Sequence, residues 1–384
     1  MIDLGVDSEP KSSAAREPAL DGIRGLAVLL VLFHHLAVFG PLTDKTLFER
    51  VAFKLGLELA MGVDLFFVLS GFLITRILLA SKSRPGFFKN FYIRRTLRIF
   101  PLYYLFVALI FLVVPHFLGK PPFQEAAALL NKEASFQRWY WLYVPNMHLF
   151  SVDAWVSPMT DHCWSLAVEE QFYLFWPWLV YFLSESGLMT ATGLLLFGSI
   201  GLRAYLVLHG HGDAAVRSFT PDHLDGLMLG AALAQFYRRG VKPDLWNRAA
   251  LACVAAGSAC RLWLILGHQG PGMDQWKQIF IIASWSLIFV GLVAKVISAP
   301  ATHAARGIFS GMILTSLGTY SYGLYLFHQP LFYLGQEYVN GRNGTDAGNW
   351  TLFLLGPVLA SFLTAWALFR YFETPFLNLK ERFN

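Results

Sequence analysis

Charged residues are scarce in this sequence. Only 14% of its 384 residues are Asp, Glu, Lys or Arg, whereas 55% are hydrophobic and 16% are aromatic. A soluble domain carries about a quarter charged residues, so this composition excludes a soluble globular protein and indicates a membrane protein. The net charge of +5 falls mostly in loops, where basic residues report orientation, and we therefore expect no nucleic-acid partner.

Cysteine is also rare, and a targeting peptide is lacking. The three cysteines, Cys163, Cys253 and Cys260, show no spacing that is typical of a metal or redox site. We interpret them as packing residues and expect no metal. Residues 1–18 are polar, mixed in charge and not followed by a small-residue cleavage site, so the first apolar segment should remain in the chain.

Long apolar segments make up most of what is present. The aromatic stretch 139–150 is too short to span a membrane and contains Pro145, so we place it in the interface. Ten other segments can cross about 30 Å of hydrocarbon, at residues 20–40, 57–79, 99–118, 164–183, 188–208, 222–238, 248–267, 278–298, 312–338 and 350–371. The sequence therefore predicts an all-α polytopic membrane protein with about ten transmembrane helices.

The basic residues of the short loops predict how this protein is oriented. The Lys- and Arg-rich segments 81–98, 237–242 and 379–383 fall on one side if ten helices cross, and the positive-inside rule makes that side the cytoplasm. Both termini are then cytoplasmic, and the longest connection, 119–163, lies outside. The predicted parts are a tail at 1–18, a membrane domain at 19–376 and a second tail at 377–384.

The first two predicted spans contain ionisable residues, which are costly in a membrane. Arg24 and His35 are almost three helical turns apart, so they share one face at heights that differ by roughly 16 Å. We favour a functional role for His35 and an interhelical hydrogen bond for His34. Asp64 has a similar predicted height, and it would either orient His35 as a base or pair with an arginine.

A basic cluster opens the third span, where Arg95 and Arg98 lie one turn apart beside Arg94. Taken alone, such a cluster is typical of a topology signal or a lipid headgroup contact. With Arg24 on the same side, however, the guanidinium groups suit a ligand with several phosphates. Coenzyme A is a cytosolic acyl donor of this kind, so we expect acyl-coenzyme A to bind Arg24, Arg95 and Arg98.

A further polar group is predicted toward the exterior. Glu169 and Glu170 lie in the outer half of the fourth span and point about 100° apart, so at most one can serve a given cavity while the other holds a neighbouring helix. Aromatic girdling explains Tyr322, whereas a site and a structural role remain equally open for His328. The predicted site thus comprises the catalytic residues His35, Asp64, Glu169 and Glu170, the donor-binding residues Arg24, Arg95 and Arg98, and the acceptor-side residues Trp164, Ser165, Asp225 and His328.

Seven segments occur in an order that resembles one family. These are "LDGIRGLAVLLVLFHH", "GVDLFFVLSGFLIT", "RRTLRIFPLYY", "WSLAVEEQFYLFWP", "LDGLMLGAALA", "SYGLYLFHQPL" and "YFETPF". Each is weak alone, but together they extend over about residues 19–382. The chain resembles the acyltransferase type 3 family of integral-membrane enzymes, which modify cell-surface sugars.

The resemblance implies an enzyme of the bacterial inner membrane that transfers an acyl group from cytosolic acyl-coenzyme A, with acetyl-coenzyme A as the expected donor, to a hydroxyl of a cell-envelope glycan. The family's arginine-ten residues-histidine motif corresponds to Arg24 and His35, and its paired arginines to Arg95 and Arg98. His223 departs from the pattern, because relatives commonly carry arginine two residues before the aspartate. Many relatives also have a periplasmic hydrolase-like domain, whereas this sequence ends soon after Pro375, so we expect it to work alone or with a separate periplasmic partner.

Several alternatives stay open from the sequence. Direct transfer and an acyl-histidine relay are both compatible with His35. The acceptor is a lipopolysaccharide sugar, an exopolysaccharide, a peptidoglycan unit, or a small glycoside or macrolide. A transporter or flippase of an envelope glycan or lipid-linked intermediate would also explain the intramembrane charges, although it would not explain why an arginine cluster is combined with one deep histidine. A structural scaffold in an envelope-assembly complex is the third alternative, and it would leave His35 dispensable.

Overall fold

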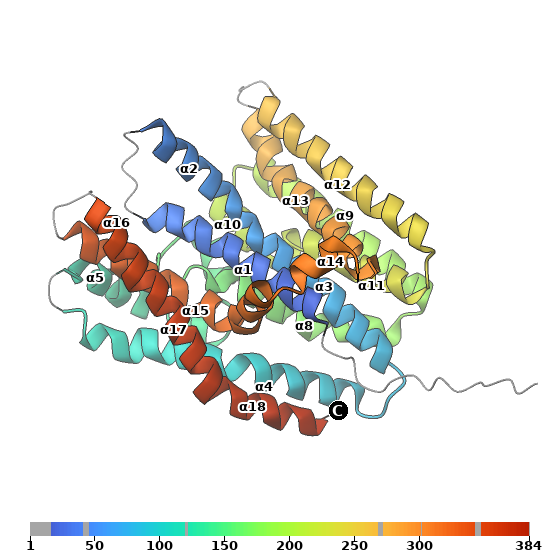
Figure 1. Ribbon diagram of the computed structural model, residues 1–384, viewed down its shortest axis with the longest axis horizontal. Helices are drawn as coiled ribbons and strands as arrows, with labels where there is room; N and C mark the ends of the chain where they lie inside the picture. The colour runs from blue at the N-terminus through green and yellow to red at the C-terminus, as the bar shows by residue number, and fades with distance from the viewer. Residues whose placement is uncertain are drawn as a thin grey trace, which may run out of the picture.

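The structure is a computed structural model that describes residues 17–40, 46–119, 122–267, 272–300, 302–341 and 347–383. Every regular element in these ranges is helical (Figure 1). The longer helices are α1 (Pro18–Phe39), α3 (Gly62–Ser81), α4 (Phe87–Ala108), α8 (Cys163–Phe182), α9 (Glu185–Leu208), α11 (Asp225–Arg238), α12 (Pro243–Leu266), α13 (Met273–Ser298) and α15 (Met312–Asn340).

Shorter helices connect or extend these elements. They are α2 (Leu47–Glu58), η1 (Leu59–Met61), η2 (Leu109–Val113), η3 (Val114–His116), α5 (Gln124–Ala134), α6 (Arg138–Trp141), α7 (Pro145–Val152), α10 (Asp213–Ser218), η4 (Thr220–Asp222), α14 (Ala304–Phe309), α16 (Ala347–Phe353), η5 (Leu354–Val358), α17 (Leu359–Leu368), η6 (Phe369–Glu373), α18 (Thr374–Lys380) and η7 (Glu381–Phe383).

Each of the ten predicted spans coincides with a helix. In the described part of the chain, seven continuous helices are long and apolar enough to cross a membrane, at Pro18–Phe39, Glu49–Ser81, Phe87–His116, Glu185–Leu208, Asp244–Leu266, Met273–Ser298 and Gly348–Phe383. The other three predicted spans correspond to α8, α11 and α15. Helix α11 has 14 residues and rises about 21 Å, which is less than the hydrocarbon thickness. The all-α polytopic fold is confirmed, whereas the number ten stays a prediction.

Large apolar side chains on the outer helices face away from the protein. Leu194 and Phe197 of α9 are 70% and 72% exposed, and Leu251 of α12 is 62% exposed. Water would make such a surface unfavourable, but lipid tails solvate it well. The exposed faces therefore agree with a protein surrounded by membrane.

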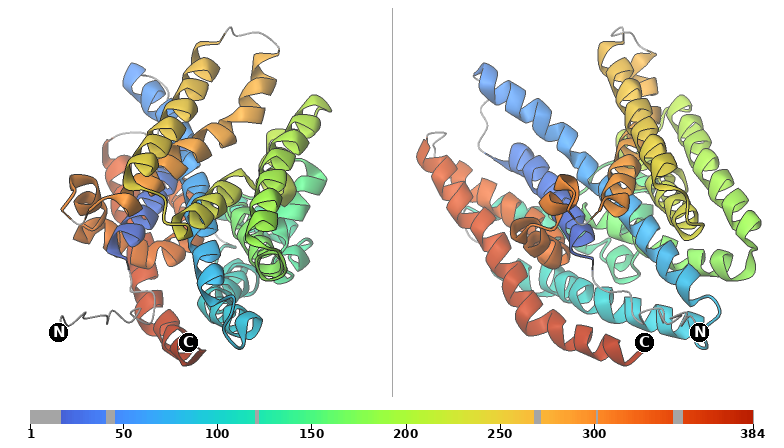
Figure 2. Two further views of the ribbon diagram at one scale, coloured as in Figure 1. Left: turned by 90° about the vertical axis from the view of Figure 1, so that its right-hand side faces the viewer. Right: turned by 45° about the vertical axis from the view of Figure 1, so that its right-hand side comes forward.

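The long helices pack around α1 and α3. Helix α1 contacts α15 on one side and α3 on the other, and α3 in turn packs against α8, α11 and α13. Helices α4 and α18 lie side by side along the lower edge of Figure 1, while α12 and α13 remain paired in every view (Figure 2). The polar residues of α1, α3, α4, α8 and α15 are thereby gathered in the interior.

Glycines let α1 and α15 approach backbone to backbone. A Cβ atom placed on Gly25 would lie 2.0 Å from the Leu314 carbonyl oxygen, and one on Gly318 would lie 1.8 Å from the Asp21 carbonyl oxygen. No side chain larger than hydrogen fits at such separations. Small residues at helix interfaces are the usual means of close packing in membranes, and here they fix α1 against α15.

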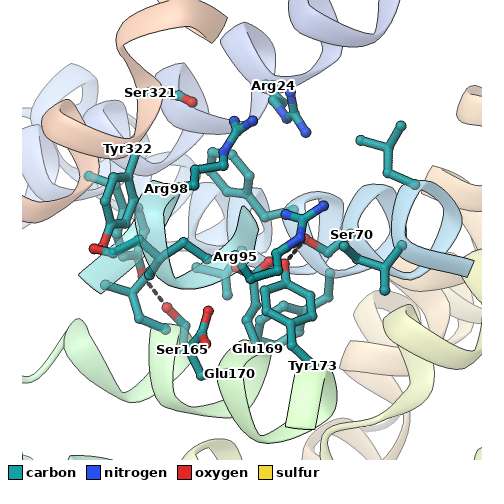
Figure 3. A pocket seen from close by; sticks show the side chains of 18 of the residues that line it. Arg24, Ser70, Arg95, Arg98, Ser165, Glu169, Glu170, Tyr173, Ser321 and Tyr322 are labelled. Atoms are coloured by element: carbon teal, nitrogen blue, oxygen red, sulfur yellow. Dashed lines mark hydrogen bonds between the residues drawn. The ribbon is translucent and has the colours of Figure 1, made fainter. Parts of the chain in front are cut away.

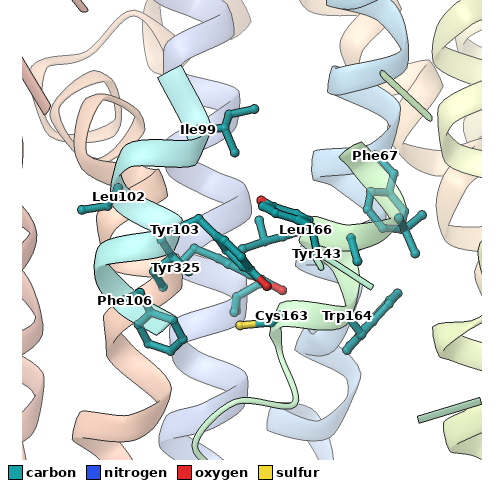
Figure 4. Packing of buried hydrophobic residues seen from close by; sticks show 14 of the residues in the cluster. Phe67, Ile99, Leu102, Tyr103, Phe106, Tyr143, Cys163, Trp164, Leu166 and Tyr325 are labelled. Carbon is teal, nitrogen blue, oxygen red and sulfur yellow. The ribbon is translucent and has the colours of Figure 1, made fainter. Parts of the chain in front are cut away.

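The stretch 139–150, which we placed in the interface, folds back onto the protein core. It forms α6 and α7, and Tyr140 and Tyr143 are buried. The Tyr103 hydroxyl of α4 donates a hydrogen bond to the Tyr140 carbonyl oxygen at 2.9 Å. The rings of Tyr103 and Tyr143 have centroids 3.8 Å apart (Figure 4). This aromatic packing places Tyr143 between α4 and α8.

Candidate active site

A cavity of about 830 Å³ lies between α1, α3, α4, α8 and α15 (Figure 3). We call it the central cavity. Its charged lining residues are Arg24, Arg95, Arg98, Glu169 and Glu170. With Ser165, six of the predicted site residues are therefore brought together in one place.

Among the described residues, two of the three arginines have no acidic partner. Arg24 pairs with Asp21 of its own helix at 3.2 Å. Arg95 instead lies over the Tyr173 ring, 5.3 Å from its centroid, and within the described residues no carboxylate lies at ion-pairing distance from Arg95 or Arg98. Positive groups held in this way attract an anionic ligand, and guanidinium forks fit phosphate oxygens well.

The two glutamates differ in their surroundings. Glu169 accepts a hydrogen bond from Ser70 Oγ of α3 at 2.5 Å, and Ser70 Oγ also lies 2.9 Å from the Tyr173 hydroxyl. Glu170, by contrast, has a buried Oε1 atom without a hydrogen-bond partner in the described structure. Glu169 thus holds a neighbouring helix, but both glutamates line the central cavity, so the expectation that at most one of them could serve a given cavity is wrong.

The glutamates do not form a separate outer site. Helix α8 runs antiparallel to α4, and Tyr92 Oη donates to the Leu174 carbonyl oxygen at 2.7 Å, which sets the two helices side by side. Arg95, one turn further along α4, therefore reaches the level of Glu170. The predicted separation of an inner arginine site from an outer glutamate site is therefore wrong, because both sets of residues line one cavity. Counting residues from the helix ends did not show that these parts of α4 and α8 lie at the same level.

Three histidines cluster beside the central cavity. His35 Nδ1 lies 3.0 Å from the Val31 carbonyl oxygen and 3.1 Å from His328 Nε2. His328 is fully buried, and its Nδ1 lies 2.9 Å from the Leu324 carbonyl oxygen. The centroid of the His162 ring is 5.7 Å from that of His328. We predicted His35 and His328 separately, and the structure brings them into contact.

These contacts define the tautomers of the two neutral rings. A carbonyl oxygen can only accept, so His328 carries its hydrogen on Nδ1, opposite Leu324, and its Nε2 atom is an acceptor. His35 Nδ1 faces two acceptors, the Val31 oxygen and His328 Nε2, and must therefore carry its hydrogen as well. The lone pair of His35 is then on Nε2, which is the arrangement that a general base requires.

Asp64 does not orient His35. Its Oδ1 atom lies 3.2 Å from Nε2 of His223, and both residues are buried. The Trp164 ring packs against His223 with centroids 5.2 Å apart, and Trp164 does not line the cavity. Neither predicted role of Asp64 is found: it pairs with a histidine and not with His35 or an arginine, because α3 turns Asp64 toward the segment before α11, whereas α1 turns His35 toward α15.

Asp225 is part of a buried ion pair. Its Oδ2 atom accepts from Arg203 Nη1 at 2.9 Å, and both side chains are completely buried. An acceptor could reach this carboxylate only by displacing Arg203, so the predicted acceptor-side role is wrong. Arg203 was missed, although an arginine inside the apolar segment 188–208 is a signal that it must have an acidic partner.

Ser165 and His34 occupy defined positions. Ser165 lines the cavity and its Oγ atom lies 2.5 Å from the Tyr325 hydroxyl, on the side where the Tyr325 ring approaches His328. His34 Nδ1 lies 3.0 Å from the Gly56 carbonyl oxygen of α2, so the interhelical hydrogen bond predicted for His34 is confirmed. Ser165 and Tyr325 thus separate the cavity from the histidine cluster.

Comparison with known proteins gives a consistent result. A family model described as an acyltransferase domain matches residues 17–370. The peptidoglycan O-acetyltransferase OatA of Listeria monocytogenes is 30% identical over 374 residues, which cover 93% of this chain and 55% of that protein. The O-acetyltransferase OatA of Staphylococcus aureus is 28% identical over 379 residues, covering 93% of this chain and 57% of that protein.

The chain spans about half the length of these curated relatives. No solved structure matches it. The family match nevertheless covers most of the sequence, including both arginine motifs and all three clustered histidines. The chain belongs to the acyltransferase family that this domain defines.

Proposed function

We propose that this chain is a membrane O-acyltransferase that transfers an acetyl group from cytosolic acetyl-coenzyme A to a hydroxyl of peptidoglycan. One observation carries the proposal: Arg95 and Arg98 lack acidic partners in the described structure and line a cavity next to a histidine cluster in which the lone pair of His35 is on Nε2. The names of the relatives, which are O-acetyltransferases, support the acetyl group, and the Listeria relative supports peptidoglycan as the acceptor.

The donor in this proposal binds through its phosphates. Arg24, Arg95 and Arg98 hold them at one side of the central cavity, and the thioester end extends toward His35. Arg24 and His35 belong to one continuous helix and lie eleven residues apart, so the phosphate site and the reacting atoms are separated by roughly 16 Å along the helix axis. A long flexible donor is suited to connect two such points.

His35 acts as the general base in the direct reaction. Its Nε2 atom takes the proton of the acceptor hydroxyl while the hydroxyl oxygen attacks the thioester carbonyl carbon. The carbon–sulfur bond then breaks, and the coenzyme A thiolate takes the proton from His35 to become a thiol. His328 contributes by holding the His35 ring through the contact with Nδ1. Close placement of the two substrates supplies the rest of the rate gain.

Binding of coenzyme A to the purified full chain tests the donor assignment. Arg95→Ala and Arg98→Ala should each weaken binding by about 1.5 to 3 kcal/mol, because a charged hydrogen bond is lost. Lys should rescue only partly, since it lacks the planar fork. Arg94→Ala is the matched control, because Arg94 neighbours these residues on α4 but does not line the cavity.

Equal affinity for coenzyme A in all three alanine variants would contradict the donor assignment. Absence of coenzyme A binding in the wild type would also contradict it, and this is the result that a transporter would give. The acceptor is tested separately. Peptidoglycan fragments from cells with and without the gene are compared by mass spectrometry, and a missing O-acetyl group in the deletion strain is expected. Unchanged peptidoglycan with a changed surface polysaccharide would redirect the proposal to another glycan.

A further inference from the structure

Tyr143 adopts a backbone conformation that aromatic residues rarely take. Its φ angle is 62°, in the left-handed region. It follows α6, where the Val144 amide donates to the Trp139 carbonyl oxygen at 2.8 Å and the Tyr143 amide to Tyr140 at 3.0 Å. This pattern ends a helix with a residue that is usually glycine. A tyrosine here costs free energy, and such strain is concentrated at functional sites.

The Tyr143 side chain is held in one direction. Its ring stacks on Phe100 with centroids 5.5 Å apart, and it also packs against Tyr103. It lines the central cavity, and its hydroxyl is buried without a hydrogen-bond partner in the described structure. The neighbouring Tyr322 hydroxyl donates its only proton to the Ile99 carbonyl oxygen at 2.8 Å. The Tyr143 hydroxyl lies near the Tyr322 oxygen but makes no hydrogen bond of normal geometry in the described structure, so a ligand in the cavity can accept its proton.

Glu170 supplies the complementary group. Its Oε1 atom is buried and unpartnered in the described structure, unlike Glu169, which accepts from Ser70. Burial raises the pKa of Tyr143 well above its usual value, and the nearby Tyr322 and Glu170 raise it further, so the phenol stays a donor at neutral pH. A rigid donor and an acceptor without a partner in the described structure therefore line the same cavity.

We propose that Tyr143 and Glu170 form a subsite for a secondary amide of the substrate. Tyr143 Oη donates to the amide carbonyl oxygen, and Glu170 Oε1 accepts from the amide N–H. Burying two unsatisfied polar groups is unfavourable, and a planar secondary amide lying between them satisfies both, because its carbonyl oxygen and its N–H point to opposite sides. This inference rests on the proposed function, in which amides occur in the pantetheine arm of the donor and in the N-acetyl groups of an amino-sugar acceptor.

The position of the subsite fits the direction proposed for the donor. Figure 3 shows Arg24 and Arg98 on one side of the cavity and Ser165 and Glu170 on α8 opposite them. Ser165 contacts the Tyr325 hydroxyl, and the Tyr325 ring packs against His328 of the histidine cluster. A ligand with phosphates at the arginines would pass the subsite before its reactive end reaches the histidines.

The test compares coenzyme A with its phosphoadenosine fragment, which lacks the pantetheine arm, on the purified full chain. Tyr143→Phe and Glu170→Met should each weaken coenzyme A binding about three- to tenfold, as expected for loss of one hydrogen bond, and leave binding of the fragment unchanged. Tyr143→Phe should not lower thermal stability, because it removes a buried hydroxyl without a partner. Tyr104→Phe is the matched control, since Tyr104 belongs to the same aromatic cluster but does not line the cavity.

The acceptor is tested in the same variants. If the amide belongs to the amino sugar, coenzyme A binding stays at the wild-type level, whereas KM for an N-acetylated glycan rises about three- to tenfold. Wild-type values for coenzyme A and for the acceptor in both variants would overturn the subsite. That result is distinguishable from failure of the proposed function, in which the wild type itself would not bind coenzyme A.

Discussion

His35 and His328 depend on each other through one contact. The Nδ1 and Nε2 atoms that join them are 3.1 Å apart, and this contact leaves the other nitrogen of His35 free. His328 does not itself need to touch a substrate in order to matter. A histidine that fixes the ring and tautomer of the base would act as a positioning residue, in the way that a carboxylate does in many hydrolases.

His35→Ala should abolish acetyl transfer while coenzyme A still binds, because Arg24 of the proposed phosphate site lies roughly 16 Å away along α1. His34→Ala is the control, since the hydrogen bond of His34 to Gly56 lies outside the histidine contact. It should keep most of the activity. Initial rates and coenzyme A affinity are measured on the same purified samples, and near-normal turnover in a folded His35→Ala protein would refute the base assignment.

The buried pair of Arg203 and Asp225 leads to a prediction about stability. Removing one partner leaves a buried charge uncompensated, so Arg203→Ala and Asp225→Ala should each lower the free energy of unfolding by about 3 to 5 kcal/mol. Thermal unfolding in detergent measures the loss. A stable Asp225→Ala protein that fails only in acceptor binding would instead favour the acceptor role that the buried geometry contradicts.

At the scale of helices, the contact of α1 with α15 positions the site. Helix α1 carries Arg24 and His35, and α15 carries His328. Gly25→Ala should lower stability by about 1 to 3 kcal/mol and reduce activity, because its Cβ atom would lie 2.0 Å from a backbone oxygen. Gly201→Ala is the control, since α9 leaves open space there. Equal unfolding temperatures for the two variants would show that the close contact does not exist in the membrane.

Hydrophobicity predicted where the helices lie along the chain but not how they are rotated. In a membrane both lipid and neighbouring helices are apolar, so periodicity says little about which face is inside. For this reason Arg95, Glu170 and His35 were recognisable as unusual residues, while their partners were not. A contact between His35 and Asp64 was predicted only from their similar heights. Tyr143 was not recognised as a site residue, because nothing in the sequence indicates that a tyrosine has a positive φ angle.

For the whole molecule, the orientation in the membrane stays a prediction. Ser83, between α3 and α4, and Ser135, after α5, are both exposed. Single cysteines at these positions, in a background without the three native cysteines, should react with an impermeant thiol reagent from opposite sides. In intact cells we expect labelling of Ser135→Cys only, with Ser83→Cys reacting after permeabilisation. The reverse pattern would place the arginines on the outer side.

The close backbone contact of α1 with α15 also has a consequence for how the protein responds to bilayer thickness. Helices accommodate a thinner or thicker bilayer by tilting or sliding, but two helices in contact through glycines such as Gly25 and Gly318 cannot slide past each other without a clash. They must tilt together, so His35 and His328 keep their separation. Turnover in vesicles made from lipids with shorter or longer tails should therefore change little, provided that the donor still reaches the arginines.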